Sequence, residues 1–340
     1  MRKRFGAWAT AGLLLAAAAL PAGAAWAQDV QSRQIKLAFL PTADHPIGLG
    51  AARFAELVAE KSGGKMKVRP FSGGTLGGDL QVVSALQGGT VEMTILVTSL
   101  LAGNVKDFIL LDSPFLFENE READAVLDGP VGEKLLAKLP EKGLVGLGFF
   151  EFGFRHFMNS KRPIERFEDL QGLKLRVSQS PVYVDFVNAI GANATPLAIP
   201  ELYGALEQKA VDGADAPLSF IRLQKYDEVQ KYLVLTKHLY NAQAILVGAK
   251  FWDRLSGDER KVLQEAAREA RAYQREASRK QDAVELDALK KTMQVTELPP
   301  EEIAKMRDRA KAVADKYSKE LDPELVAGLQ AELDKARAGR

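Results

Sequence analysis

Two arginines lie in apolar segments of the chain, where a charged side chain needs a specific partner. Arg155 follows the apolar residues 144–152, and Arg176 lies within the apolar run 173–177. If residues 173–177 form a strand, alternation places Arg176 on the face opposite its two neighbours. The planar guanidinium group donates two parallel hydrogen bonds to a carboxylate. Both arginines are therefore candidate carboxylate receptors, and a surface ion pair is the alternative for each.

Few other residues indicate catalytic chemistry. The chain has no cysteine, and its three histidines are far apart in sequence, which excludes a thiolate nucleophile and argues against a histidine-rich metal site. The glycine-rich residues 73–78 lack the Lys-Ser/Thr pair of a phosphate-binding loop, which favours a tight strand-to-helix loop whose backbone approaches a ligand or another part of the protein. An acid and a base would have to come from Asp79, Asp215 and His45, whose pairing the sequence does not reveal. We expect no enzymatic activity, no cofactor and no metal.

The first 27 residues differ from the rest of the chain. Residues 2–4 are basic, an apolar run extends to Leu20, and Ala25-Trp26-Ala27 has the form of a cleavage site. This pattern predicts a secretory signal peptide, because the run is too short to serve as a membrane anchor. Its removal changes the formal net charge from +1 to −2. We therefore expect no affinity for nucleic acid or for anionic membranes.

The body of the chain alternates short apolar runs with amphipathic segments. Strands are expected at residues 35–40, 66–70, 91–96, 144–152, 173–177 and 211–215. Helices are expected at residues 51–61, 79–88, 120–139, 182–190 and 200–208. This order predicts an α/β protein with a sheet covered by helices.

The last part of the chain reads as helical. Ser256, with Glu259 three residues later, has the form of a capping box. From there one helix is expected to continue to about Met293, long enough to span more than one lobe. Two more helices are expected at residues 300–320 and 323–338.

Several motifs in the central part of the chain occur together in one known family. The most specific are Gly153-Phe154-Arg155, residues 159–164, residues 168–177, residues 191–197 and Val211-Asp212-Gly213. From His45 to about Tyr240, the chain resembles the solute receptors of tripartite ATP-independent periplasmic (TRAP) transporters, in the dicarboxylate-receptor (DctP) branch. The resemblance implies a monomeric periplasmic protein that delivers a small carboxylate to membrane permease subunits.

The fold implied by this resemblance is a two-lobed α/β periplasmic binding protein fold, similar to class II, with a long helix spanning both lobes. Residues 28–152 and about 242–280 are expected to form lobe I. Residues 153–241 and about 281–340 are expected to form lobe II, and the ligand cleft lies between the lobes.

The resemblance also implies roles for particular residues. The arginine matching Arg176 pairs with the ligand carboxylate, and the arginine matching Arg155 commonly assists. Ala216 stands where the family has an asparagine, and Ile199 stands in place of an aromatic wall. Asp215 could accept a hydrogen bond from a ligand hydroxyl or serve as a turn carboxylate. These departures leave the identity of the acid open.

Other candidate ligand contacts are Asp79, His45, Phe39, Phe154 and Tyr240, with core packing as the alternative for each aromatic residue. C4-dicarboxylates, sugar acids and oxo or hydroxy acids all fit a carboxylate receptor. The alternatives are a binding protein for an amino acid or an aromatic acid, and a secreted enzyme that acts on a small carboxylate.

Overall fold

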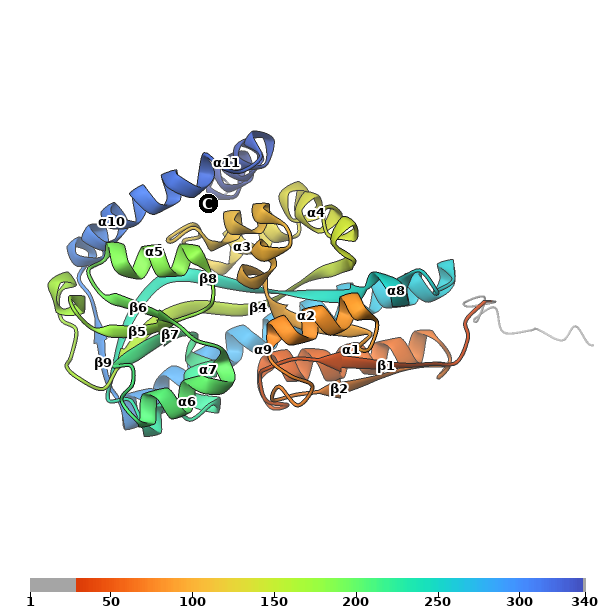
Figure 1. The fold of residues 1–340 in the computed structure, drawn as a ribbon, viewed down its shortest axis with the longest axis horizontal. Helices are drawn as coiled ribbons and strands as arrows, with labels where there is room; N and C mark the ends of the chain where they lie inside the picture. Colours follow the sequence, from red (N-terminus) through yellow and green to blue (C-terminus); the bar gives the residue numbers. More distant parts are fainter. Residues whose placement is uncertain (1–28, 339–340) are drawn as a thin grey trace, which may run out of the picture.

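A computed structural model describes residues 29–338 as an elongated α/β molecule (Figure 1). The expected signal peptide, residues 1–27, lies outside the described residues. Among those that are described, no helix is long and apolar enough to cross a membrane.

One continuous sheet runs the length of the described part of the chain. The strand order is β2-β1-β3-β8-β4-β7-β5-β6, and β9 pairs with β8. The strands are β1 (Arg33–Ala38), β2 (Met66–Phe71), β3 (Met93–Val97), β4 (Leu144–Asn159), β5 (Lys174–Val177), β6 (Asn193–Pro196), β7 (Gly213–Ala216), β8 (Tyr232–Gly248) and β9 (Gln294–Glu297). At one end of the sheet, β1 is parallel to β2 and β3; at the other, β5 is parallel to β6 and β7.

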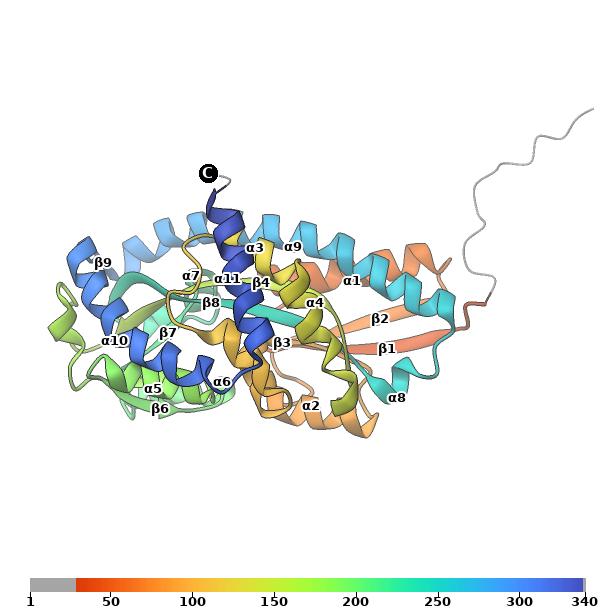
Figure 2. The same ribbon diagram turned by 90° about the horizontal axis from the view of Figure 1, so that it is seen from above.

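Helices cover both faces of this sheet (Figure 2). They are α1 (Pro46–Lys61), α2 (Asp79–Gly88), α3 (Glu120–Leu127), α4 (Pro130–Ala137), α5 (Pro181–Ala189), α6 (Ile199–Glu207), α7 (Leu218–Leu223), α8 (Ala249–Trp252), α9 (Gly257–Thr292), α10 (Pro300–Ser318) and α11 (Pro323–Ala338). Short 3₁₀ helices lie at Thr98–Gly103, Lys106–Asp112, Pro140–Lys142, Phe167–Leu170 and Tyr226–Glu228. The expected α/β architecture is confirmed.

Side-chain alternation along the strands builds two hydrophobic cores, one on each face of the sheet. Ile35 and Leu37 of β1 belong to the core that includes residues of α1 and α9. On β5, Leu175 and Val177 belong to the opposite core, together with residues of α5. This placement matches the predicted alternation, which turns Arg176 away from both of its neighbours.

The two long strands connect the ends of the molecule. β4 and β8 pair antiparallel along their length, with register shifts at three places. One end of β8 pairs with β3, and the other end pairs with β9. The expected division into two lobes stays a prediction; β4 and β8 would then be the strands that join them. The C-terminal helices contact both parts, because α10 packs on α5 and α11 packs on α3 and α4.

The long helix α9 confirms the prediction made from Ser256. The Ser256 hydroxyl accepts a hydrogen bond from the Glu259 amide at 3.2 Å, and the Glu259 carboxylate accepts one from the Ser256 amide at 2.9 Å. The Glu259 carboxylate also pairs with Arg33 at 2.9 Å. The helix packs against α1 and β4 and reaches α7 and β9, so it spans both ends of the sheet.

Three predicted boundaries were wrong, and proline explains two of them. The helix expected at residues 120–139 is two helices, because Gly129 is extended and Pro130, which lacks an N–H, begins α4. Helix α1 starts at Pro46 rather than Ala51, since proline is well suited to a first helical turn. Strand β4 does not stop at Phe152 but continues to Asn159.

Gly153 adopts a backbone conformation in β4 that would be strained for any other residue. Its φ angle is +103°, and a Cβ atom there would lie 3.2 Å from Oδ2 of Asp282 on α9. We expect Gly153→Ala to lower the free energy of unfolding by about 1–3 kcal/mol, the usual cost of such a backbone conformation for a non-glycine residue. Urea denaturation would measure the change.

The matched control is Gly204→Ala in the middle of α6, where a Cβ would meet no atom within 4 Å. That change should raise the free energy of unfolding by about 0.5–1 kcal/mol, since alanine favours helix. Equal effects at the two positions would contradict the assignment of strain to Gly153.

Candidate ligand-binding site

The carboxyl ends of parallel strands from the two ends of the sheet meet at a cavity. Leu40 follows β1, Val97 ends β3, Ser178 follows β5, and Ala216 ends β7. Ligands of open α/β sheets bind at this edge of the strands. The fold therefore places a binding site here before any side chain is considered.

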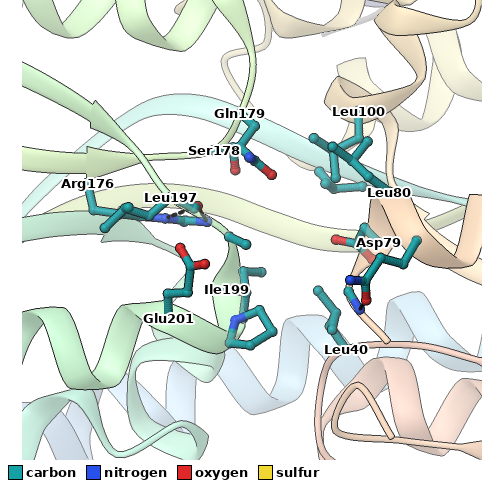
Figure 3. A pocket seen from close by; sticks show the side chains of 15 residues that line it. Leu40, Asp79, Leu80, Leu100, Arg176, Ser178, Gln179, Leu197, Ile199 and Glu201 are labelled. Atoms are coloured by element: carbon teal, nitrogen blue, oxygen red, sulfur yellow. Dashed lines mark hydrogen bonds between the residues drawn. The ribbon is translucent and has the colours of Figure 1, made fainter. Parts of the chain in front are cut away.

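The cavity has two connected parts. The outer chamber has a volume of about 350 Å³ and is lined by Leu40, residues 78–81, Val97, Leu100, Arg176, Ser178, Gln179 and residues 197–201. The inner chamber, of about 20 Å³, shares Leu40, Asp79, Val97, Arg176, Ser178 and Ile199 and adds Pro41, Ile95, Phe152, Arg155, Leu202, Asp215, Ala216, Phe220 and Gln243. In Figure 3, Arg176 and Glu201 lie on one side of the outer chamber, and Leu40 and Asp79 lie on the other.

Arg176 is a buried cation that forms no ion pair with any of the described residues. Its side chain is 4% exposed, and its Nε and Nη2 both donate to the Leu197 carbonyl, at 2.9 and 2.7 Å. Within residues 29–338, no carboxylate pairs with it, and its Nη1 group has no hydrogen-bond partner. Burial lowers the pKa of Arg176 to about 10, and the nearby Arg155 adds to that effect. An anion that enters the cavity would supply the missing charge.

Two helices also begin at the cavity. The first residues of α2 and of α6 line the outer chamber from opposite sides. The free N–H groups and the dipole of a helix N-terminus favour a negative charge. Both helix N-termini therefore favour an anion in the cavity, as Arg176 does.

Arg155, in contrast, is already paired inside the protein. Its Nε and Nη2 donate to the two carboxylate oxygens of Asp215 at 2.6 and 2.9 Å, and Nη2 also donates to the Asp215 carbonyl. Nη1 donates to Asn241 at 2.7 Å. Burial alone would raise the pKa of Asp215, but the contact with Arg155 outweighs it and holds that pKa well below its usual range. Arg155 therefore has little capacity left for a ligand.

A wider polar network surrounds this pair. Nε2 of His238 lies 3.2 Å from Asp215, and Nδ1 lies 2.7 Å from the Thr236 hydroxyl. Burial lowers the pKa of His238, although the carboxylate opposes this. The side chain of Asn241 donates to the Tyr183 hydroxyl. The Arg155–Asp215 pair is thus held from several strands and helices.

Asp79 is the acidic group that faces the cavity opposite Arg176. It is the first residue of α2 and lines both chambers. Burial raises its pKa to about 7, although Arg176 opposes the shift. Near neutral pH, this carboxyl therefore changes between a neutral and a negative form inside the cavity.

Ligand binding should depend on pH through Asp79. Below about pH 7 the group is protonated, and above it a negative charge opposes a bound anion. We expect affinity for a carboxylate to fall as pH rises through 7, by up to about tenfold per pH unit. Titration calorimetry between pH 6 and 8.5 would measure this.

Asp79→Asn is the corresponding test, since the amide cannot ionise. The variant should bind with an affinity that is nearly constant over the same range. A wild-type affinity that does not change with pH would show that Asp79 does not titrate beside the bound anion.

The structure brings together six of the ten candidate contacts. Arg176, Asp79 and Ile199 line both chambers, and Arg155, Asp215 and Ala216 line the inner one. Ala216 presents only a methyl group there.

The other four candidates do not line either chamber. His45 caps α1, where its Nδ1 accepts from the Ile47 amide at 3.1 Å, and burial lowers its pKa to about 3. Phe39 is packed in the core shared with α1. Phe154 and Tyr240 pack edge to face at 5.2 Å, on the core of the opposite face. The three aromatic residues therefore pack in the hydrophobic cores, which was the alternative given for each of them.

Several cavity residues were not recognised in the sequence. Ser178 and Gln179 directly follow the strand that carries Arg176, so their position at a strand end was a usable signal. Gln243 is the polar residue within the apolar stretch 242–248 of β8, which was a weaker signal. Among residues 29–338, no group of three or more His, Asp or Glu side chains is arranged to hold a metal ion.

A cavity between two sheet ends, crossed by long strands and holding an unpaired arginine, defines a binding protein for a small anion. A family model described as "Bacterial extracellular solute-binding protein, family 7" (DctP) matches residues 38–320. The chain belongs to this family of TRAP solute-binding proteins, which are not enzymes. Its fold is accordingly the α/β periplasmic binding protein fold, as expected.

Two solved structures are similar over nearly their whole length. One is the sugar acid binding protein DctPAm from Advenella mimigardefordensis in complex with galactonate, with 41% identity and a TM-score of 0.88, covering 91% of this chain and 100% of that chain. The other is a TRAP periplasmic solute-binding protein from Ochrobactrum anthropi with its C-terminus bound in the ligand-binding pocket. It has 50% identity and a TM-score of 0.83, covering 92% of this chain and 98% of that chain.

A third relative is known by sequence. The C4-dicarboxylate-binding periplasmic protein DctP of Rhodobacter capsulatus is 33% identical over 300 residues, which are 87% of this chain and 90% of that protein.

Proposed function

We propose that this protein is the periplasmic receptor of a TRAP transporter and that Arg176 binds the carboxylate of a small organic acid. The observation that carries the proposal is the buried guanidinium of Arg176, which has unused donors and no ion-pair partner within residues 29–338. A carboxylate that pairs with it in a cavity with little water is attracted more strongly than at an exposed site. The loaded receptor would then deliver the acid to the membrane permease subunits.

The charges around the cavity favour an acid with a single carboxylate. Of the described residues that line the two chambers, the cations are Arg155 and Arg176, and Asp215 already neutralises the first. Asp79 and Glu201 are the other ionisable groups of the lining. A second carboxylate would find no free cation there and would face acidic groups instead. A monocarboxylate that carries hydroxyl groups, such as the galactonate bound to DctPAm, fits this distribution better than a C4-dicarboxylate.

A thermal-shift screen of the purified protein would test the proposal. The panel would contain sugar acids, 2-hydroxy acids, 2-oxo acids and C4-dicarboxylates. A ligand at a hundredfold excess over its Kd stabilises the fold by about 2.7 kcal/mol, or about 4 °C for a protein of this size. Shifts with hydroxylated monocarboxylates would support the proposal, and a panel without any shift would refute it.

A further inference from the structure

Ser178 lies directly after strand β5, beside Arg176 on the wall of the cavity. The strand ends at Val177, and alternation continued by one residue turns Ser178 to the same side as Arg176. Both residues line the outer and the inner chamber. In Figure 3, Ser178 lies above Arg176 on the same side of the outer chamber. The two side chains can therefore contact the same part of a ligand.

The hydroxyl group of Ser178 is free and accessible. The residue is 6% exposed, and its hydroxyl makes no hydrogen bond with any of residues 29–338. Its oxygen is not among the fully enclosed side-chain atoms of the described residues that lack a hydrogen-bond partner. Since the residue lines both chambers, the accessible surface of this side chain faces the cavity. The hydroxyl of Ser180 differs, because it donates to the buried Asp112 carboxylate at 3.3 Å.

An anion bound at Arg176 can accept more hydrogen bonds than this arginine supplies. Two of the five N–H donors of the guanidinium are held by the Leu197 carbonyl. An ionised carboxylate has about four sites that accept hydrogen bonds. Elsewhere in the inner chamber, Arg155 is paired with Asp215, and Ala216 presents a methyl group. A hydroxyl beside the arginine adds a donor without adding charge.

Serine suits this position for two chemical reasons. Its O–H group rotates to meet an acceptor, and no acceptor among the described residues holds it, so no bond within the protein has to break when an anion arrives. A hydrogen bond to an ionised carboxylate is also stronger than one between neutral groups. The contact gains further strength inside a cavity with little water.

We propose that Ser178 donates a hydrogen bond to the ligand carboxylate that pairs with Arg176, so that the end of β5 supplies two different donors to one group. The inference rests on the proposed function, because it takes the carboxylate at Arg176 as the fixed end of the ligand. A carboxylate is common to all the acids of the screen. Ser178 therefore adds affinity for the whole class and does not select among its members.

Ser178→Ala removes the hydroxyl and changes the volume of the side chain very little. Titration calorimetry should show that the variant binds the best acid of the screen on the order of tenfold to a hundredfold more weakly. An analogue of that acid without the hydroxyl at carbon 2 should lose affinity by a similar factor. The unfolding temperature without ligand should not change, because the hydroxyl has no hydrogen-bond partner among the described residues.

The matched control is Ser84→Ala, the same substitution at an exposed position of α2 that does not line either chamber. It should change the affinity for neither acid. A loss in the Ser178→Ala variant that is confined to the acid with the hydroxyl at carbon 2 would overturn the inference, since Ser178 would then contact that hydroxyl and not the carboxylate.

The outcomes separate this inference from the proposed function. If the wild type binds none of the acids, or if Arg176→Ala does not weaken binding, the proposed function fails. If binding depends on Arg176 but Ser178→Ala binds the best acid as tightly as the wild type, only the role of Ser178 is refuted.

Discussion

Replacing Arg176 with alanine is expected to abolish useful ligand binding while leaving the fold intact. The guanidinium is buried, the residue lines both chambers, and its Nη1 group has no hydrogen-bond partner among the described residues. Removing one partner of a buried charge pair costs about 2–5 kcal/mol in binding, so the Kd should rise between about 30-fold and several thousand-fold. Titration calorimetry with the best acid of the screen would measure the loss.

The stability of the unliganded variant gives the second readout. Because Arg176 has no counter-ion in the described structure, its removal should leave the unfolding temperature unchanged or raise it. Arg166→Ala is the matched control, since this arginine is exposed and pairs with its near neighbour Asp169. The carboxylate proposal would be contradicted by an Arg176→Ala protein that is folded and binds the acid with undiminished affinity.

Replacing Asp215 with alanine is expected to cause the largest loss of stability. The change leaves the guanidinium of Arg155 buried without its counter-ion and takes an acceptor from Nε2 of His238. Breaking a buried ion pair from one side costs about 3–5 kcal/mol. For a protein of this size, that corresponds to a decrease of about 5–8 °C in unfolding temperature. Urea denaturation and calorimetry would both register it.

Two further variants show whether the loss comes from the unpaired charge. Asp308→Ala removes an aspartate that also pairs with a basic residue, but at an exposed position of α10, and should change stability by less than about 1 kcal/mol. The double change Arg155→Met with Asp215→Leu should recover much of the loss, since no lone charge remains. A single Asp215→Ala variant as stable as wild type would show that the pair contributes little.

Local patterns predicted much of the fold. The bounds of α2 and α9 follow from a glycine-rich loop, a capping box and the spacing of apolar residues, all of which are signals within a few positions of one another. The alternation of Leu175, Arg176 and Val177 likewise fixed which way the arginine points. These features depend on the backbone period and not on distant partners.

The partners inside the site could not be predicted in this way. Arg155 pairs with the carboxylate of Asp215, 60 residues later, through the pairing of β4 with β7, and its expected help in ligand binding stays a prediction. The position of Gln243 depends on β8 lying between β3 and β4. Such contacts arise from sheet order, which no local pattern encodes. His45, which precedes Pro46, did carry a local signal, because a residue before an N1 proline is a plausible helix cap.

The pairing of β3 with β8 also determines when the sheet can form during synthesis of the chain. Val97 lies beside Gln243, yet after Val97 the ribosome must add 146 more residues, the last of them Gln243, before the two can meet. At about 5–20 residues per second, the first end of the sheet waits roughly 7–30 s for its missing central strand. Until β8 arrives, β1, β2 and β3 lack the strand that connects them to the rest of the sheet. The sheet therefore cannot be completed for most of the synthesis of the chain. During that time, any factor that binds unfolded polypeptide can bind the nascent chain.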